Sequence, residues 1–158
     1  MVRRATPEEF AHLRWVELES DKLMGQAGIG PLPEDDGEDR LAGATVVFAS
    51  GNPAVGFVSV TLVDDGAHVD QLSVLPAYGR RGIGRVLLDR AIGWARDEGL
   101  AGVTPTTFCD VPWSAPFYRT VGFEAVSHPA AGLAAIRAYE RASGHDALGP
   151  RVAMRLVC

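Results

Sequence analysis

The feature that most constrains the fold is the segment 68–98, HVDQLSVLPAYGRRGIGRVLLDRAIGWARDE, in which an alternating apolar strand leads through a Gly- and Arg-rich turn into an amphipathic helix. The first backbone N–H groups of a helix have no intrahelical acceptor, and the aligned peptide dipoles add partial positive charge there. Glycines let an anion approach these groups closely, and arginines add positive charge around it. The junction therefore predicts a phosphate-binding loop. Its expected members are Gly79, Arg80, Arg81, Gly82, Ile83, Gly84 and Arg85.

Two common glycine-rich loops do not match this turn. A dinucleotide-binding loop has the pattern G-x-G-x-x-G, but counting from Gly82 and Gly84 the third position is Leu87. A nucleoside-triphosphate loop ends in Gly-Lys-Ser/Thr, whereas Gly84 is followed by Arg85 and Val86. The turn therefore fits neither of these kinds of phosphate site.

The remaining pattern, R-R-G-x-G between a strand and a helix, resembles the acetyl-CoA loop of the GNAT superfamily of acyl-CoA N-acyltransferases, Q/R-x-x-G-x-G/A. Gly82 and Gly84 match the glycines of that loop. Gly79 stands where the family usually has Gln or Arg, so the positive charge moves one residue along, to Arg80. The resemblance implies that acetyl-CoA binds here as the acyl donor.

A second segment, residues 110–123, reads DVPWSAPFYRTVGF and resembles another signature of the same superfamily, an Ala-rich turn followed by F/L-Y-x-x-x-G-F. The matching residues are Phe117, Tyr118, Gly122 and Phe123. The Asn that often opens this signature is replaced by Val111. In order and spacing, the resemblance extends over roughly residues 42–157.

The resemblance implies a GNAT-like acyl-CoA N-acyltransferase fold of the α/β (α+β) class. Such a fold has a mixed, mostly antiparallel sheet of six to seven strands, flanked by helices and with splayed central strands. We expect one domain over residues 1–158, with a cofactor-binding core at about 42–125. Pro105 fits the splay, because a residue without an N–H is unusual in a fully paired central strand but loses no partner where it faces a gap.

Hydrophobic periodicity and turn residues predict the elements along the chain. A first helix is expected over residues 7–26, with Thr6 and Glu9 in a capping box. The segment 25–40, rich in Gly, Pro and acidic residues, is expected to be a mobile loop beside the acceptor site. Strands are expected at 2–5, 45–50, 54–63, 68–75, 100–110, 123–126 and 151–157, and further helices at 82–98 and 133–143.

Composition argues against several classes of partner. The net charge of −5 is unsuited to binding nucleic acid, which requires clustered positive charge over an extended face. The chain has no apolar stretch of membrane-spanning length and no signal-like N-terminus, so we expect a cytoplasmic protein without a membrane partner. The two cysteines, Cys109 and Cys158, and the scattered histidines show no metal-ligand spacing, so no metal site is expected. Cys109 is interpreted as structural, because no paired His is identifiable.

The resemblance also implies roles in acyl transfer. Main-chain groups of Leu72, Ser73 and Val74 would pair with the pantetheine amides, and the Val74 N–H would polarise the acetyl oxygen. Tyr118 would act as the general acid that protonates the leaving CoA thiol. A neutral phenol with a pKa of about 10 suits a thiol with a pKa of about 8.5.

The general base is assigned to Asp70. This residue lies two positions before Leu72, where many members of the superfamily carry Glu, and strand alternation would place His68, Asp70 and Leu72 on one face. An Asp near the start of a strand is, however, more often simply solvated. His68 is the second candidate for the base.

These observations predict an N-acetyltransferase that transfers the acetyl group of acetyl-CoA to a primary amine by direct attack in a ternary complex. The acceptor is expected to be a small-molecule or peptide amine, and the acidic residues near it favour a cationic one. The alternative is a non-catalytic acyl-CoA sensor or interaction module of the same fold. A homodimer is left open.

Overall fold

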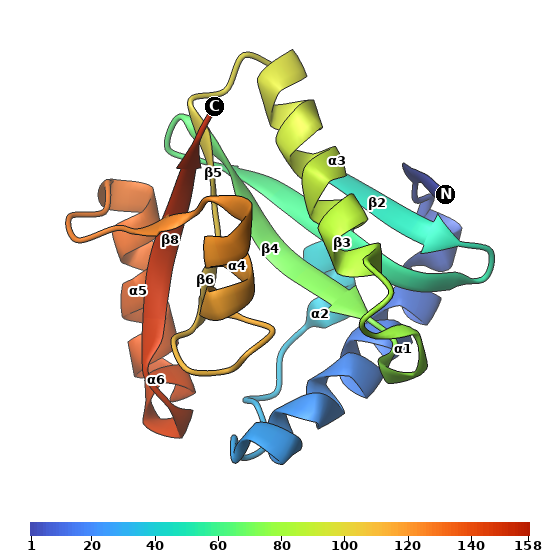
Figure 1. The fold of residues 1–158 in the computed structure, drawn as a ribbon, viewed down its shortest axis with the longest axis horizontal. Coiled ribbons are helices and arrows are strands. Elements are labelled where there is room, and N and C mark those ends of the chain that lie inside the picture. The colour runs from blue at the N-terminus through green and yellow to red at the C-terminus, as the bar shows by residue number, and fades with distance from the viewer.

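The computed structural model describes all 158 residues, and its centre is an eight-stranded sheet (Figure 1). The spatial order is β1-β2-β3-β4-β5-β8-β6, with β7 paired to β8, and only β4 and β5 run parallel. The predicted mixed, mostly antiparallel sheet is confirmed. Its strands are β1 (Val2–Arg4), β2 (Val46–Gly51), β3 (Ala54–Val63), β4 (Gly66–Val74), β5 (Gly102–Thr104), β6 (Thr106–Phe108), β7 (Glu124–Ala125) and β8 (Arg151–Val157).

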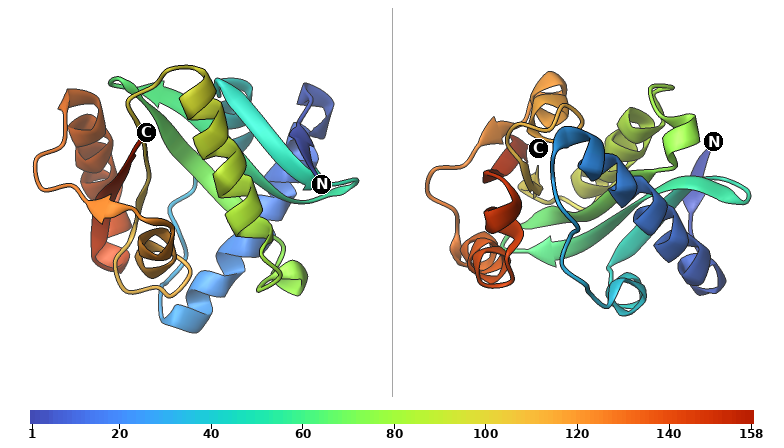
Figure 2. Two further views of the ribbon diagram at one scale, coloured as in Figure 1. Left: turned by 45° about the horizontal axis from the view of Figure 1, so that its top comes forward. Right: turned by 90° about the horizontal axis from the view of Figure 1, so that it is seen from below.

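Helices cover both faces of the sheet, with α3 on one face and α1 and α2 on the other (Figures 1 and 2). None of them combines the length and the apolar character that crossing a bilayer requires. The helices are α1 (Phe10–Asp21), α2 (Gly37–Ala42), α3 (Ile83–Asp97), α4 (Ala115–Val121), α5 (Ala131–Ala142) and α6 (His145–Leu148), with 3₁₀ turns η1 (Pro7–Glu9), η2 (Lys22–Ala27) and η3 (Pro76–Tyr78).

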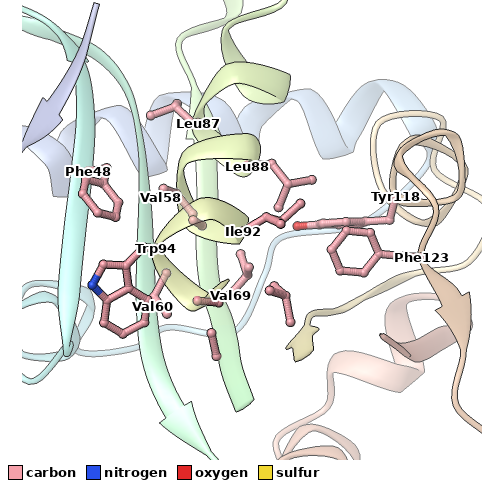
Figure 3. Packing of buried hydrophobic residues seen from close by; sticks show 14 of the residues in the cluster. Phe48, Val58, Val60, Val69, Leu87, Leu88, Ile92, Trp94, Tyr118 and Phe123 are labelled. Atoms are coloured by element: carbon pink, nitrogen blue, oxygen red, sulfur yellow. The ribbon is translucent and has the colours of Figure 1, made fainter. Parts of the chain in front are cut away.

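Two apolar clusters hold these layers together, one on each face of the sheet. Strand β2 shows the alternation that separates them, because Val46 and Phe48 belong to the cluster under α3, whereas Val47 and Ala49 belong to the cluster under α1. Figure 3 shows part of the larger cluster, where side chains of α3 pack against the sheet and against the aromatic residues around α4. This packing holds helix α3 against the sheet, over β4.

The sheet splits between β4 and β5. These strands are paired only at Ala67 with Val103 and at His68 with Thr104. Beyond that point β4 continues along β3, while Pro105 interrupts the other strand and β6 pairs only with β8. The predicted splay is therefore confirmed, and Figure 1 shows the gap widening away from the β4–β5 pairing. The predicted single strand 100–110 is two short strands, which raises the strand count above six to seven.

A β-bulge in β4 changes the side-chain alternation predicted for this strand. Ser59 of β3 pairs with Gln71, but Val60 pairs with Val69, so Asp70 is an extra residue without a partner on β3. Leu72 consequently packs into the cluster under α3, while Asp70 meets Arg40 of α2 on the other face. Of the three residues expected on one face, His68 and Asp70 share it but Leu72 lies on the other, because alternation assumes an uninterrupted ladder.

The segment 25–40, expected to be one loop, contains two ordered elements. The turn η2 extends to Ala27, and α2 begins at Gly37. Acidic residues in the first turn of α2, Glu38 and Asp39, complement the positive end of the helix. The first helix also begins differently from the prediction, since Pro7–Glu9 is a 3₁₀ turn with the capping box between Thr6 and Glu9, and α1 starts at Phe10.

Candidate active site

The turn between β4 and α3 has the backbone geometry of an anion-binding loop. Gly82 caps α3 in the left-handed region, with φ of 80°, and no side chain bonds to the free N–H groups of the first turn. The first intrahelical bond runs from the Val86 N–H to the Gly82 C=O at 3.1 Å. The N–H groups of Ile83, Gly84 and Arg85 therefore remain available to a ligand.

Three arginines surround this turn in different ways. Arg80 has a positive φ of 62° and lines the cleft beside the loop. Arg85 also lines the cleft and is joined to Asp89 by a 3.0 Å ion pair, Nε to Oδ1. Arg81 does not line the cleft, and its guanidinium lies 5.1 Å from the centroid of the Tyr78 ring. The loop thus presents Arg80 and Arg85 to the cleft.

Strand β4 exposes main-chain groups along the gap in the sheet. The Leu75 N–H bonds to the Val55 C=O at 2.8 Å. Because antiparallel pairs alternate between bonded and non-bonded, Ser73 also faces β3, while Leu72 and Val74 direct their N–H and C=O groups to the opposite edge. No strand pairs with that edge beyond His68. Ser73 is buried, and its Oγ accepts a 2.9 Å hydrogen bond from Gln71, so its side chain is not part of the cleft.

A cleft of about 1450 Å³ occupies the gap and joins the predicted site residues into one space. Its cofactor end is formed by the β4–α3 turn and by Leu72 and Val74. Its middle is bordered by Tyr118 and His68, and its far end by α1, by residues 32–36 and by α5. The side chains of Ser73 and Arg81 are the only predicted site members that do not line it.

Tyr118 lies in the wall of the cleft and is only 6% exposed. Its ring packs edge to face on Phe123, with centroids 5.2 Å apart, and its hydroxyl end points toward Leu88 and Ile92 of α3 (Figure 3). The hydroxyl has no hydrogen-bond partner in the protein, and burial raises the pKa of Tyr118. The phenol therefore stays neutral, and its proton is available to a ligand.

Asp70 is held by a charge network at the far end of the cleft. Its Oδ2 accepts a 2.9 Å hydrogen bond from Arg40 Nη1, and Arg40 Nη2 lies 3.0 Å from both Glu17 Oε2 and Asp35 Oδ2. Arg14 contacts the same two acids, at 3.2 Å and 3.0 Å. Three carboxylates thus share two guanidinium groups, which leaves this end of the cleft negative.

Arg40→Met is expected to destabilise the protein by roughly 2 kcal/mol, because Glu17 is only 4% exposed and would lose one of its two cationic partners. Urea denaturation measures the change. Lys22→Met is the control, since it breaks only the exposed ion pair with Glu19 and should change the free energy of unfolding by less than about 0.5 kcal/mol. Equal losses in the two variants would contradict the importance of the Arg40 network.

Asp21 is a fourth carboxylate on this side and has no ion-pair partner. It lies one helical turn beyond Glu17 and lines the cleft. Burial, with a further contribution from Glu17, raises the pKa of Asp21 to about 7. A carboxylate that is harder to ionise in the folded protein than in the unfolded chain lowers stability at neutral pH.

Asp21→Asn is therefore expected to stabilise the protein by about 1–2 kcal/mol at pH 8, where the wild-type carboxylate must be charged. This free energy is smaller than the pKa difference alone would give, because the carboxylate is partly solvated. The unfolded chain titrates near pH 4, so the gain should shrink as pH falls from 7 toward 4. Denaturant unfolding of both proteins at several pH values tests this. A gain that does not depend on pH would contradict it.

Sequence patterns predicted more of the residues that line the cleft at the β4–α3 turn than of those that line its far end. Arg40, Glu17 and Asp21 were not predicted. The spacing of Glu17 and Asp21 on one face of α1 is a local signal that could have indicated them. Nothing local indicates Arg40, because it meets Asp70 thirty residues away in sequence.

Taken together, the loop, the split sheet and the cleft define a mixed α/β fold with a candidate anion site at one end of the gap. The Acetyltransferase (GNAT) family model matches residues 3–123, and the chain belongs to this family. It is therefore an acyltransferase by family, as the two sequence signatures predicted. No group of three or more His, Cys, Asp or Glu residues is arranged to hold a metal ion.

Solved structures of this family share the fold at low sequence identity. The PaiA N-acetyltransferase of Thermoplasma acidophilum, in complex with coenzyme A, is 17% identical with a TM-score of 0.75, covering 100% of this chain and 98% of that one. Rv2747 of Mycobacterium tuberculosis, in complex with CoA, is 20% identical with a TM-score of 0.70 and coverages of 100% and 99%. The ribosomal-protein-S18-alanine N-acetyltransferase of Escherichia coli is 17% identical with a TM-score of 0.69 and coverages of 99% and 92%. The coenzyme in two of them agrees with the predicted acyl donor.

Proposed function

We propose that this protein transfers the acetyl group of acetyl-CoA to a primary amine, by direct attack of the amine in a ternary complex. One observation carries the proposal: a single cleft runs from the β4–α3 turn, past Tyr118, to Asp70 and the acids of α1. Donor and acceptor can then occupy opposite ends of one space and meet at the split in the sheet. Such a meeting removes the need for a covalent acyl-enzyme.

In this proposal the coenzyme binds along the gap. Its pyrophosphate sits on the N–H groups of Ile83, Gly84 and Arg85, with Arg80 and Arg85 beside it. Arg81 contributes positive charge from outside the cleft, and Gly79 allows the chain to turn toward the helix. The free main-chain edge of Leu72–Val74 pairs with the pantetheine amides, and the Val74 N–H polarises the acetyl C=O.

The amine attacks the acetyl carbon, an N–C bond forms, and the C–S bond breaks. The leaving sulfur receives a proton from Tyr118, whose raised pKa keeps it protonated at neutral pH. Asp70 attracts the ammonium form of the acceptor and accepts a proton from it through water. To do so, Asp70 uses Oδ1, because Oδ2 is held by Arg40.

The acceptor end of the cleft favours a cationic amine. Glu17, Asp35 and Asp70 share two arginines, and Asp21 is unpaired. A positively charged acceptor would offset this excess of negative charge.

The test is titration of the purified protein with acetyl-CoA by calorimetry, followed by thiol release with polyamines, amino acids, aminoglycosides and peptide N-termini. Micromolar binding with amine-dependent release supports the transferase and identifies the acceptor class. Binding without release from any amine favours the rival function, a non-catalytic acyl-CoA sensor. Absence of binding would contradict both.

A further inference from the structure

His68 is the last residue of β4 that pairs with β5 before the two strands separate. It is 4% exposed, and its Nδ1 lies 3.0 Å from Oγ1 of Thr104, its partner across the strand pair. This hydrogen bond fixes the orientation of the imidazole ring. The ring is therefore held at the apex of the split, where donor and acceptor would meet.

The second ring nitrogen of His68 is free. Nε2 has no hydrogen-bond partner in the protein and is accessible to solvent. His68 also lines the cleft. The imidazole thus presents an unpaired polar atom to the space between the cofactor end and the acids of α1.

The surroundings favour the neutral form of this histidine. Burial lowers the pKa of His68, and Asp70, Glu140 and Asp64 oppose that effect. Each of these acids is bound elsewhere: Asp70 to Arg40, Glu140 to Arg137 and Arg151, and Asp64 to the first N–H groups of α5. None of them is hydrogen-bonded to the ring, so no carboxylate stabilises the imidazolium and a neutral imidazole is available at neutral pH.

The number of protons that the acceptor amine loses requires a second base in the site. An acceptor that arrives as an ammonium ion loses two protons from nitrogen, one before attack and one after the N–C bond forms, while the thiolate sulfur gains only one. Asp70, with one oxygen held by Arg40, is proposed above as the group that draws in the ammonium and takes the first proton. The second proton needs an acceptor close to the reacting carbon.

We propose that His68 is a second catalytic base, whose Nε2 accepts the proton that leaves the amine nitrogen as the N–C bond forms and the C–S bond breaks. Thr104 Oγ1 accepts a hydrogen bond from Nδ1–H and so keeps Nε2 in the accepting state. Tyr118 supplies the proton that the sulfur takes. One of the two protons taken up by Asp70 and His68 returns to the Tyr118 phenolate, and the other leaves to solvent, so the net reaction releases one proton. This inference rests on the proposed N-acetyltransferase activity.

The experiment is the pH profile of kcat at saturating acetyl-CoA and saturating amine. In the wild-type protein kcat should fall as pH drops below the pKa of His68, because the protonated ring cannot accept. His68→Gln should lower kcat by about a hundredfold and remove this acidic limb, with acetyl-CoA affinity unchanged. His145 is the matched control, because burial lowers its pKa as well. If the acidic limb of the kcat profile belongs to His68, His145→Gln must keep that limb. His128→Gln, at an exposed position, should behave as the wild type.

A second pair of variants tests the tautomer and does not depend on the folding of His68→Gln. Thr104→Val removes the acceptor for Nδ1–H and should lower kcat about tenfold, whereas Thr104→Ser should restore it. Wild-type kcat with an intact acidic limb in His68→Gln, or equal kcat in the two Thr104 variants, would overturn the role of His68. Acetyl-CoA binding without turnover by the wild type would instead overturn the proposed function, and this inference with it.

Discussion

Tyr118→Phe is expected to lower kcat by about a hundredfold to ten-thousandfold while leaving acetyl-CoA affinity unchanged. The substitution removes only the hydroxyl, so the ring keeps its edge-to-face contact with Phe123 at 5.2 Å. The leaving sulfur then has no proton donor and must depart as a thiolate. Thiol release under single-turnover conditions measures the chemical step separately from product release.

The loss in Tyr118→Phe should depend on the leaving thiol in a way that identifies the role of the hydroxyl. A thiol with a pKa well below the value of about 8.5 expected for CoA leaves more easily as a thiolate, so the deficit should shrink with an acetyl thioester of such a thiol. Tyr139→Phe is the matched control, because Tyr139 is 66% exposed on α5. A Tyr118→Phe enzyme with wild-type kcat at pH 7 would contradict the acid assignment.

The parts of this site that the sequence predicted are formed by residues that lie close together in the chain. The anion-binding turn needs Gly82 at a positive φ and free N–H groups at the start of α3, and both are properties of a few consecutive residues. Tyr118 was predicted in the same way, through a short signature; it lies on α4 and lines the cleft, and its role as the acid stays a prediction. The split of the sheet after β5 was predicted from Pro105, because proline has no N–H to donate to a neighbouring strand.

The parts that sequence did not predict depend on contacts between distant segments. The bulge at Asp70 is set by the register of β4 against β3, and alternation along β4 alone cannot reveal it. The role of Arg40 depends on how α2 packs beside α1 and β4, because Arg40 and Asp70 are thirty residues apart in the chain. Helix α2 itself lies in a segment whose Gly, Pro and acidic residues are typical of loops.

The bulge also explains how one strand serves both ends of the cleft. Before it, Val69 packs under α3, so His68 faces the other side of the sheet, where Asp70 meets Arg40. After it, Leu72 and Val74 pack under α3, next to the proposed cofactor loop. A strand without the extra residue would place Asp70 and Leu72 on the same face.

Gly82→Asp is expected to raise the Kd for acetyl-CoA at least a hundredfold, which is about 2.7 kcal/mol. Two effects act together. A side chain at φ of 80° strains the backbone that directs the first N–H groups of α3, at about 1–2 kcal/mol. The carboxylate would also place negative charge where the pyrophosphate binds, and Arg80 and Arg85 would pair with it instead of with the ligand. Calorimetric titration with acetyl-CoA measures the loss.

Two control variants separate these effects. In Gly82→Ala the added Cβ meets nothing within 4 Å, so only the backbone strain remains and the Kd should rise no more than about tenfold. Gly93→Asp adds the same charge to the same helix, also with nothing within 4 Å of the new Cβ, but away from the turn, and should bind acetyl-CoA as the wild type does. If all three variants bind equally well, the turn at Gly82 is not the pyrophosphate site. If Gly93→Asp loses affinity as strongly as Gly82→Asp, the effect arises from overall charge and not from the loop.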